Sequence, residues 1–220
     1  MGHKTNPKSL RIKGIADWNS QGFYGHRFPH LLEEDFDIRE FLTEKIKEAG
    51  IDSIKIERSA NQINIVVYSA RPGLIIGRGG TAAEELKKEL NIRLLKIRRR
   101  TGNTKKTELR LEIQEVKNPW ISANLVSQAI ARQLERRLPF RRVLKQSLEK
   151  VMENKEIKGA RVEVAGRLDG VDISRTEWLK KGLLPRQTLR ADMDYGQFEA
   201  RCTYGTLGIK VWLYKGEKFD

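Results

Sequence analysis

A short glycine-rich loop lies between a short apolar turn of helix and a second predicted helix, in the stretch Ile75-Ile76-Gly77-Arg78-Gly79-Gly80-Thr81. Its glycines remove the side chains that would keep a sugar–phosphate backbone away from the loop. A helix that starts after Gly80 offers unpaired amides and the positive end of its dipole, and Arg78 adds a full charge. The loop therefore predicts contact with the backbone of a nucleic acid.

A second interpretation of this loop is a dinucleotide site, because Gly77 to Ala82 formally match the fingerprint G-x-G-x-x-A. That fingerprint follows a full strand, whereas Pro72 and Gly73 leave only a short apolar run before the first glycine. About 20 residues downstream, where an acid should bind the ribose, the chain carries arginines at 98–100. An oxidoreductase of this type is therefore rejected.

The segments around the loop alternate between helical and strand patterns. Helical spacing predicts a helix from a capping box of Asp37 and Glu40 to a stop at Gly50. Alternation predicts strands around 54–56, 63–67 and 109–113, and Thr81 with Glu84 predicts a capped helix after the loop. This order resembles a type II KH module, whose GXXG loop clamps single-stranded backbone. We expect that module over residues 33–117.

The second half of the chain begins at a break, Asn118-Pro119. A helical stretch runs to Leu138, Pro139 forces a turn, and a second helix follows from Phe140 to about Glu153. Alternating strands then fill the remainder. The predicted fold class is α+β: a basic N-terminal arm over 1–32, the type II KH domain, and a second α+β domain over 118–220.

The charge of the chain favours a polyanionic partner. Its 43 Lys and Arg against 29 Asp and Glu give a net charge of +14 and a pI near 9.9. The surplus is concentrated in an arm, a stretch at 87–106 and a helical region at 132–150. Blocks of like charge repel one another, so a bound polyanion is expected to neutralise them. The candidate contacts of the arm and the first stretch are Lys4, Lys8, Arg11, Lys13, Arg98, Arg99, Arg100, Lys105 and Lys106.

Catalytic and metal-binding patterns are sparse. The zinc-protease, nucleophile-elbow and phosphate-loop motifs are missing from the sequence. Asp192 and Asp194 could hold a metal, but two carboxylates on a strand are commonly exposed, and Cys202 has no neighbouring histidine. We predict no enzyme, no cofactor and no metal. No apolar run approaches the roughly 18 residues of a membrane span, and no secretion leader follows the first residue. Tryptophans 120, 178 and 212 are predicted to be packing anchors.

Several longer motifs resemble one family over nearly the whole chain, the ribosomal protein S three family of the small subunit, bacterial or organellar type. The motifs that carry the resemblance are Met1-Gly2-His3-Lys4-Thr5-Asn6-Pro7, the KH loop, Gln133-Leu134-Glu135-Arg136-Arg137, Phe140-Arg141-Arg142, Gly166-Arg167-Leu168, Arg175-Thr176-Glu177-Trp178, Thr188-Leu189-Arg190-Ala191-Asp192, and Thr203-Tyr204-Gly205 followed by Gly208-Ile209-Lys210-Val211-Trp212.

The resemblance implies a structural protein of the subunit head that binds ribosomal RNA and helps form the tunnel through which messenger RNA enters. It implies RNA contact by the loop Ile76, Gly77, Arg78, Gly79 and Gly80, and messenger contact by Arg136, Arg137, Arg141, Arg142 and Lys145. Expected partners are ribosomal RNA, messenger RNA and ribosomal proteins S ten, S fourteen, S two, S four and S five. The expected location is the cytoplasm or an organelle matrix or stroma. The stretch 93–106 is longer than the family usually has, and the chain stops at Asp220, before the extended tail of many members.

Two other functions use the same features. A KH protein acting alone on messenger would explain the loop and would show a preference for particular short single strands. A nuclease using Asp192 and Asp194 would lose its cleavage when both acids are replaced.

Overall fold

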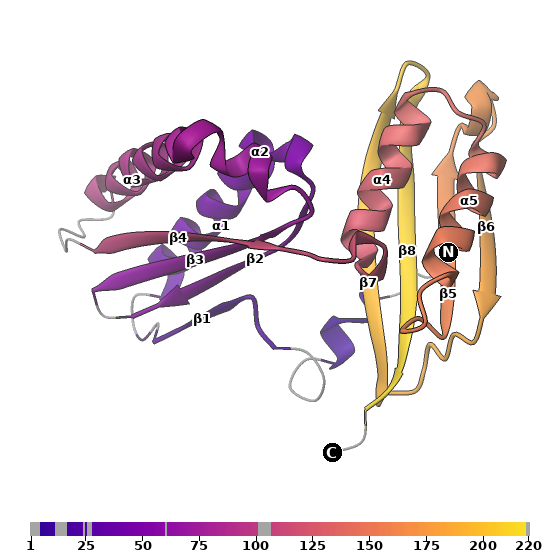
Figure 1. Cartoon of the computed structure of the whole chain (residues 1–220), viewed down its shortest axis with the longest axis horizontal. Coiled ribbons are helices and arrows are strands. Elements are labelled where there is room, and N and C mark those ends of the chain that lie inside the picture. Colours follow the sequence, from indigo (N-terminus) through magenta and orange to yellow (C-terminus); the bar gives the residue numbers. More distant parts are fainter. Residues whose placement is uncertain are drawn as a thin grey trace. The chain divides into compact units, whose positions relative to one another are not determined.

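The computed structural model describes residues 5–11, 17–23, 25, 28–59, 61–100 and 107–218. The chain forms two compact units (Figure 1). One is Trp18–Lys117, and the other combines Met1–Asp17 with Asn118–Asp220. The residues that the sequence groups as one arm, 1–32, are thus divided between the two units.

The first unit is a mixed sheet covered by helices. Its strand order is β1-β2-β3-β4, with β2 and β3 antiparallel and the two outer pairs parallel. Its elements are β1 (Ser20–Gly22), α1 (Phe28–Lys45), β2 (Ile51–Arg58), β3 (Gln62–Ser69), α2 (Pro72–Ile76), α3 (Thr81–Arg100) and β4 (Glu108–Glu115). From α1 onward this is the type II KH order, so the predicted fold of this unit is confirmed.

One apolar cluster joins the three helices to the sheet. It contains side chains of α1, of α2 through Ile75, of α3 through Leu90 and Leu94, and of the strands. The apolar positions predicted for α1 and the strands are all within this cluster or packed against it: Ile38, Phe41, Leu42, Ile46, Ala49, Ile54, Ile56, Ile63, Ile65, Val67, Leu109, Leu111 and Ile113. Burying these faces supplies the main free energy for folding the unit.

Local predictions for α1 and for the arm before it are wrong. Helix α1 begins at Phe28, so Asp37 and Glu40 lie inside it and cannot cap its start. Pro29 is tolerated there because the first helical turn needs no backbone donor from it. Strand β1, which pairs with β2, lies in the predicted irregular arm and is too short to show an alternating pattern.

The second unit is an antiparallel sheet with two helices on one face (Figure 1). Its strand order is β6-β5-β8-β7. Its main elements are α4 (Ala123–Glu135), α5 (Phe140–Met152), β5 (Gly159–Gly166), β6 (Arg175–Gly182), β7 (Ala191–Cys202) and β8 (Gly205–Glu217). The predicted break at Pro139 is confirmed, because α5 starts directly after it.

Helix α4 lies very close to strand β7. A Cβ atom added to Gly196 would lie 2.4 Å from the carbonyl carbon and oxygen of Ala123. Two residues earlier on the strand, Asp194 Oδ2 accepts the backbone N–H of Ala123 at 2.7 Å. Strand β7 therefore fixes the first turn of α4 and, through that helix, the corner between α4 and α5.

Candidate RNA-binding surfaces

The glycine loop forms a tight, open turn between α2 and α3, which we call the KH loop (Ile76–Gly80). Gly77, Gly79 and Gly80 have φ values of 71°, 62° and 82°, which L side chains rarely adopt. A Cβ on Gly79 or Gly80 would meet no atom within 4 Å, so this side of the loop is open. Arg78 is exposed and Ile75 is buried below the loop. The turn can therefore receive a phosphate backbone.

Helix α3 starts directly at the loop. Thr81 already has helical angles, φ −59° and ψ −42°, and its hydroxyl donates a hydrogen bond to the carbonyl of Arg78 at 3.0 Å. Thr81 is thus inside the helix instead of preceding it as the predicted cap. The bond ties the loop to the first turn of α3, whose amides point toward the open side.

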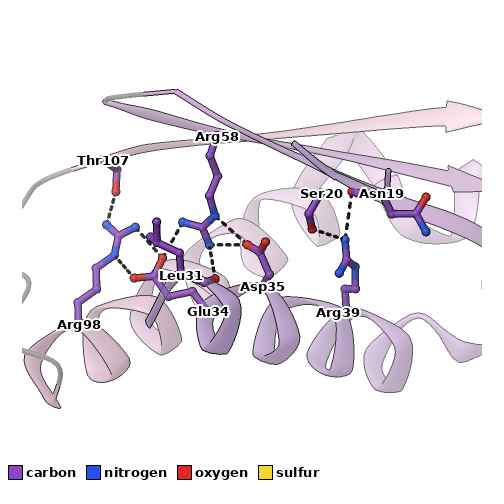
Figure 2. Close-up of polar contacts among 9 residues, drawn as sticks. All are labelled: Asn19, Ser20, Leu31, Glu34, Asp35, Arg39, Arg58, Arg98 and Thr107. Atoms are coloured by element: carbon purple, nitrogen blue, oxygen red, sulfur yellow. Dashed lines mark hydrogen bonds and ion pairs between the residues drawn. The ribbon is translucent and has the colours of Figure 1, made fainter. Parts of the chain in front are cut away.

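The arginines at the other end of α3 do not share one environment. Arg99 and Arg100 are exposed, whereas Arg98 is only 6% exposed. Figure 2 shows Arg98 turned toward Glu34 of α1, with Nε of the arginine 2.9 Å from Oε1 of the acid. Nη2 of Arg98 donates to Glu34 Oε2 at 3.2 Å, and Nη1 donates to the hydroxyl of Thr107. Arg98 is therefore a poor candidate for RNA contact, because its guanidinium is already neutralised inside the protein.

Glu34 also binds a second arginine (Figure 2). Arg58 of β2 donates to Glu34 Oε2 at 2.8 Å and to Asp35 at 2.5 Å. Burial by itself raises the pKa of Glu34, but hydrogen bonds from Arg98 and Arg58 outweigh it, so that pKa lies below its usual value. The acidic stretch that the sequence presents as a surface feature is partly a buried ion cluster joining α1, β2 and α3.

The N-terminal cations are divided in the same way. The Arg11 side chain is only 4% exposed and donates to the carbonyl oxygens of Pro7, Arg186 and Thr188. Lys8 is partly exposed and forms an ion pair with Asp194 at 2.5 Å. Arg11 is thus taken up by the second unit and is not a surface cation. The predicted contacts Lys4, Lys13, Lys105 and Lys106 lie outside the described residues.

Five cations gather where α4 turns into α5, and we call this group the arginine corner: Arg136, Arg137, Arg141, Arg142 and Lys145. All of them are exposed. On α5 the opposite side is buried, through Phe140, Val143 and Leu144, so the first turns present their cations outward. Arg141 lies 3.6 Å from Glu177, and its side chain remains 72% exposed. The arrangement can bind successive phosphates without reading bases.

The backbone of the corner is held in a defined shape. The Leu138 N–H bonds to the carbonyl of Gln133 and the Arg137 N–H to that of Leu134, the two bonds of a Schellman motif. The motif places Arg137 in the left-handed region, with φ 61°, where glycine is usual. An arginine at this position raises the conformational free energy of the helix end, because its Cβ crowds the following carbonyl oxygen.

The carboxylates that could suggest metal chemistry are engaged elsewhere. Asp194 caps α4 and pairs with Lys8, and Asp192 lies 3.4 Å from Lys218. Within the described parts of the chain, no group of three histidine, cysteine, aspartate or glutamate side chains is arranged to hold a metal.

Comparison with known proteins identifies the family. Residues 37–121 match a family described as KH domain, and residues 130–213 match Ribosomal protein S3, C-terminal domain. The small ribosomal subunit protein uS3 of Desulfitobacterium hafniense is 43% identical over 217 residues, which is 99% of this chain and 94% of that protein. The chain belongs to the uS3 family.

Other uS3 proteins match equally broadly. The uS3 protein of Caldicellulosiruptor saccharolyticus is 46% identical over 218 residues, covering 99% of this chain and 93% of that protein. That of Endomicrobium trichonymphae is 45% identical over 219 residues, covering 100% and 90%.

Membership in the uS3 family confirms the resemblance read from the motifs and identifies a structural protein, not an enzyme. The nuclease interpretation of Asp192 and Asp194 is therefore not retained. None of the helices in the described residues is long and apolar enough to span a membrane.

Proposed function

We propose that this chain is a cytoplasmic, RNA-binding constituent of the small ribosomal subunit whose KH loop holds ribosomal RNA and whose arginine corner holds incoming messenger RNA. Membership in the uS3 family supports the coarser part of this proposal, a structural role in the small subunit with ribosomal RNA and ribosomal proteins as partners. The observation that supports messenger binding is the exposed cluster of five cations at the α4–α5 corner.

The proposed ribosomal RNA contacts are the loop glycines and three exposed arginines of the first unit. They comprise the KH loop with Arg78 and the exposed end of α3 with Arg99 and Arg100. Arg11 and Arg98 are left out, because internal partners bind both guanidinium groups. The specific protein neighbours implied by the resemblance, S ten, S fourteen, S two, S four and S five, remain expectations.

Replacing Arg78 with alanine tests the KH loop. We expect weaker binding of a short single-stranded RNA and a log–log salt slope that is less steep by about 0.7, the value for one lost phosphate contact. Fluorescence anisotropy at several salt concentrations measures both. Arg110→Ala, which removes an exposed cation of β4 outside the loop, should leave the slope unchanged. An unchanged slope for Arg78→Ala would show that the loop does not contact phosphate.

The messenger role of the arginine corner rests on its shape as well as its charge. A residue in the left-handed region is usually glycine, yet Arg137 occupies that position and extends the cationic surface by one side chain. A strained backbone conformation costs free energy, and such conformations cluster at ligand-binding sites. The strain at Arg137 therefore supports a binding role for this exposed cation.

Replacing Arg141 and Arg142 together by alanine tests that role. We expect assembly into small subunits to be retained, because both side chains are exposed. Messenger binding by these subunits should weaken, with the salt slope reduced by about 1.4 for two lost contacts. Sedimentation and messenger binding are measured on the same preparation. The control is the double variant Lys155→Ala and Lys181→Ala, which removes two exposed cations outside the corner and should change neither assembly nor messenger binding. Loss of assembly in the arginine variant would instead assign Arg141 and Arg142 a structural role.

Replacing Arg137 with glycine separates stability from binding. Glycine adopts a φ of 61° without a Cβ clash, so the free energy of unfolding should rise by about 0.5–1 kcal/mol. Messenger binding should weaken at the same time, since one cation is lost. Urea denaturation measures the first effect, and Arg137→Lys retains the charge as a control for the second. A decrease in stability on Arg137→Gly would contradict the strained backbone.

A further inference from the structure

The edge strand β6 carries charged side chains on the side of the sheet that faces α5. The strand runs beside that helix at the border of the sheet (Figure 1). Glu177 pairs with Val164 and Leu179 with Val162, and both valines are fully buried in the cluster that packs against the helices. Side chains at alternate positions of a strand share a side. Arg175 and Glu177 therefore lie on the helix side of β6.

Glu177 joins an arginine of the arginine corner to an arginine of the edge strand. Its Oε1 atom lies 3.6 Å from Nη2 of Arg141 and 3.8 Å from Nε of Arg175. Two guanidinium groups from separate elements thus converge on a single carboxylate oxygen. Within the described part of the chain, Glu177 is the one carboxylate that forms an ion pair with a member of the corner. The cationic surface therefore continues from α5 to β6 across this acid.

The Arg141 guanidinium is held on a second side. It lies 5.6 Å from the ring centroid of Phe140, which is buried in the core of the second unit. A guanidinium attracted to an aromatic ring is restricted in its position, and its planar fork of donors loses little freedom when it binds an anion. Phe140 and Glu177 together fix where Arg141 presents its donors.

The ion pairs of Glu177 are loose and open to water. Both distances exceed the value of about 2.7–2.9 Å that is typical of a strong charge-assisted hydrogen bond. The side chains of Glu177, Arg141 and Arg175 are 30%, 72% and 49% exposed. Exposed pairs of this kind contribute little to stability. An anion that binds the arginines more strongly can therefore displace the carboxylate at small cost.

The phosphate of single-stranded RNA is the anion that fits this pair of arginines. A phosphodiester offers two unesterified oxygens, and guanidinium groups bind them through paired N–H donors. A carboxylate from a partner protein would only exchange with the carboxylate of Glu177, like for like. Because Arg141 already belongs to the proposed messenger-binding surface, the strand that occupies the corner brings its phosphates to this point.

We propose that Arg141 and Arg175 form a phosphate subsite for messenger RNA, which Glu177 fills until the messenger displaces it. The inference rests on the proposed function, because it adds to the arginine corner one further binding residue, Arg175, and an internal competitor. A contact that an internal acid can take over is readily released, which suits a strand that must move past it.

Replacing Glu177 with glutamine tests the competition in assembled small subunits. Messenger binding should tighten by about two- to fivefold at low salt, because an exposed ion pair no longer opposes it. Glu156→Gln is the matched control, since it removes the same charge from an exposed position beyond the other end of α5 and should leave binding unchanged. In chains that also carry Arg141→Ala and Arg175→Ala, the gain from Glu177→Gln should vanish.

Replacing Arg175 with alanine tests the second arginine. The log–log salt slope of messenger binding should become less steep by about 0.7, the value for one lost phosphate contact. Lys181→Ala, at the other end of the same strand and on the same side, should leave the slope unchanged. Thermal unfolding of each full-length variant verifies that the second unit is intact.

Three results would overturn the proposal: unchanged or weaker binding for Glu177→Gln, an equal gain for Glu156→Gln, or an unchanged slope for Arg175→Ala. The variant with Arg141→Ala and Arg142→Ala is measured alongside. If it binds messenger normally, the proposed function has failed and the subsite with it. If it binds weakly while the Glu177 and Arg175 variants do not respond, only the subsite has failed.

Discussion

Replacing Glu34 with alanine is expected to lower the free energy of unfolding by about 3–5 kcal/mol, because it removes the buried acid that two buried arginines share. Glu34 is 1% exposed and binds both Arg58 and Arg98, whose side chains are 7% and 8% exposed. Total stabilities of single domains are about 5–15 kcal/mol, so such a loss is a large fraction. Urea denaturation of the full chain, followed at equilibrium, measures the change.

The same acid makes stability depend on pH in a defined direction. The folded-state pKa of Glu34 lies below its unfolded value of about 4.3, so its contribution is fully present above that value. The contribution is lost as the pH falls through the lower, folded-state pKa. We expect Glu34→Gln to have a smaller loss of stability between about pH 5 and pH 2 than the unmodified chain.

Glu33→Ala is the matched control for this prediction. Glu33 precedes Glu34 and pairs with Arg100, but the two side chains are 41% and 70% exposed. Exposed pairs contribute about 0–1 kcal/mol, so this variant should be nearly as stable as the unmodified chain. Equal losses for the two variants would contradict the special role of the buried acid.

Replacing Gly196 with valine is expected to destabilise the second unit by about 3 kcal/mol or more, since the neighbouring backbone of α4 cannot move away without distorting the sheet. Even a Cβ would lie 2.4 Å from the backbone of Ala123. The displaced helix carries the arginine corner at its far end, so messenger binding should fall together with stability. Thermal unfolding and messenger binding are measured in parallel.

Gly208→Val supplies the comparison within the same sheet. Gly208 lies in β8, and the nearest atom to an added Cβ is the carbonyl oxygen of Ala165 at 3.9 Å, an ordinary contact. This substitution should cost much less. If both valine variants were equally stable, the close approach of α4 to β7 would not matter for folding.

Features of the fold that depend on residues close together in the sequence were predicted correctly. The surroundings of side chains that meet residues far away in the sequence were not. The glycine loop, the strands beside it and the break at Pro139 follow from local backbone preference and alternation, and all are present. Arg98 and Arg99 are equivalent in any count of charge. Only the folded position of α1 shows that the first reaches Glu34 while the second remains at the surface.

Two tryptophans of the second unit show the same limit. Trp178 and Trp212 have the same residue type and were predicted to play the same role, yet one lies on the edge strand β6 and the other on the central strand β8. That difference depends on strand order, which periodicity does not give. It separates a half-exposed ring from one enclosed by Tyr195, Arg161 and Arg186.

The attachment of the N-terminal segment constrains the order in which the chain can fold during its own synthesis. Arg11 binds the carbonyl oxygens of Arg186 and Thr188, and Lys8 binds Asp194. Lys8 and Arg11 can therefore make these contacts only after residues 186–194 have been translated. The Trp18–Lys117 unit has all its strands long before that moment, so it can fold first, and closure of the other unit is a late step that follows the translation of residues 186–194.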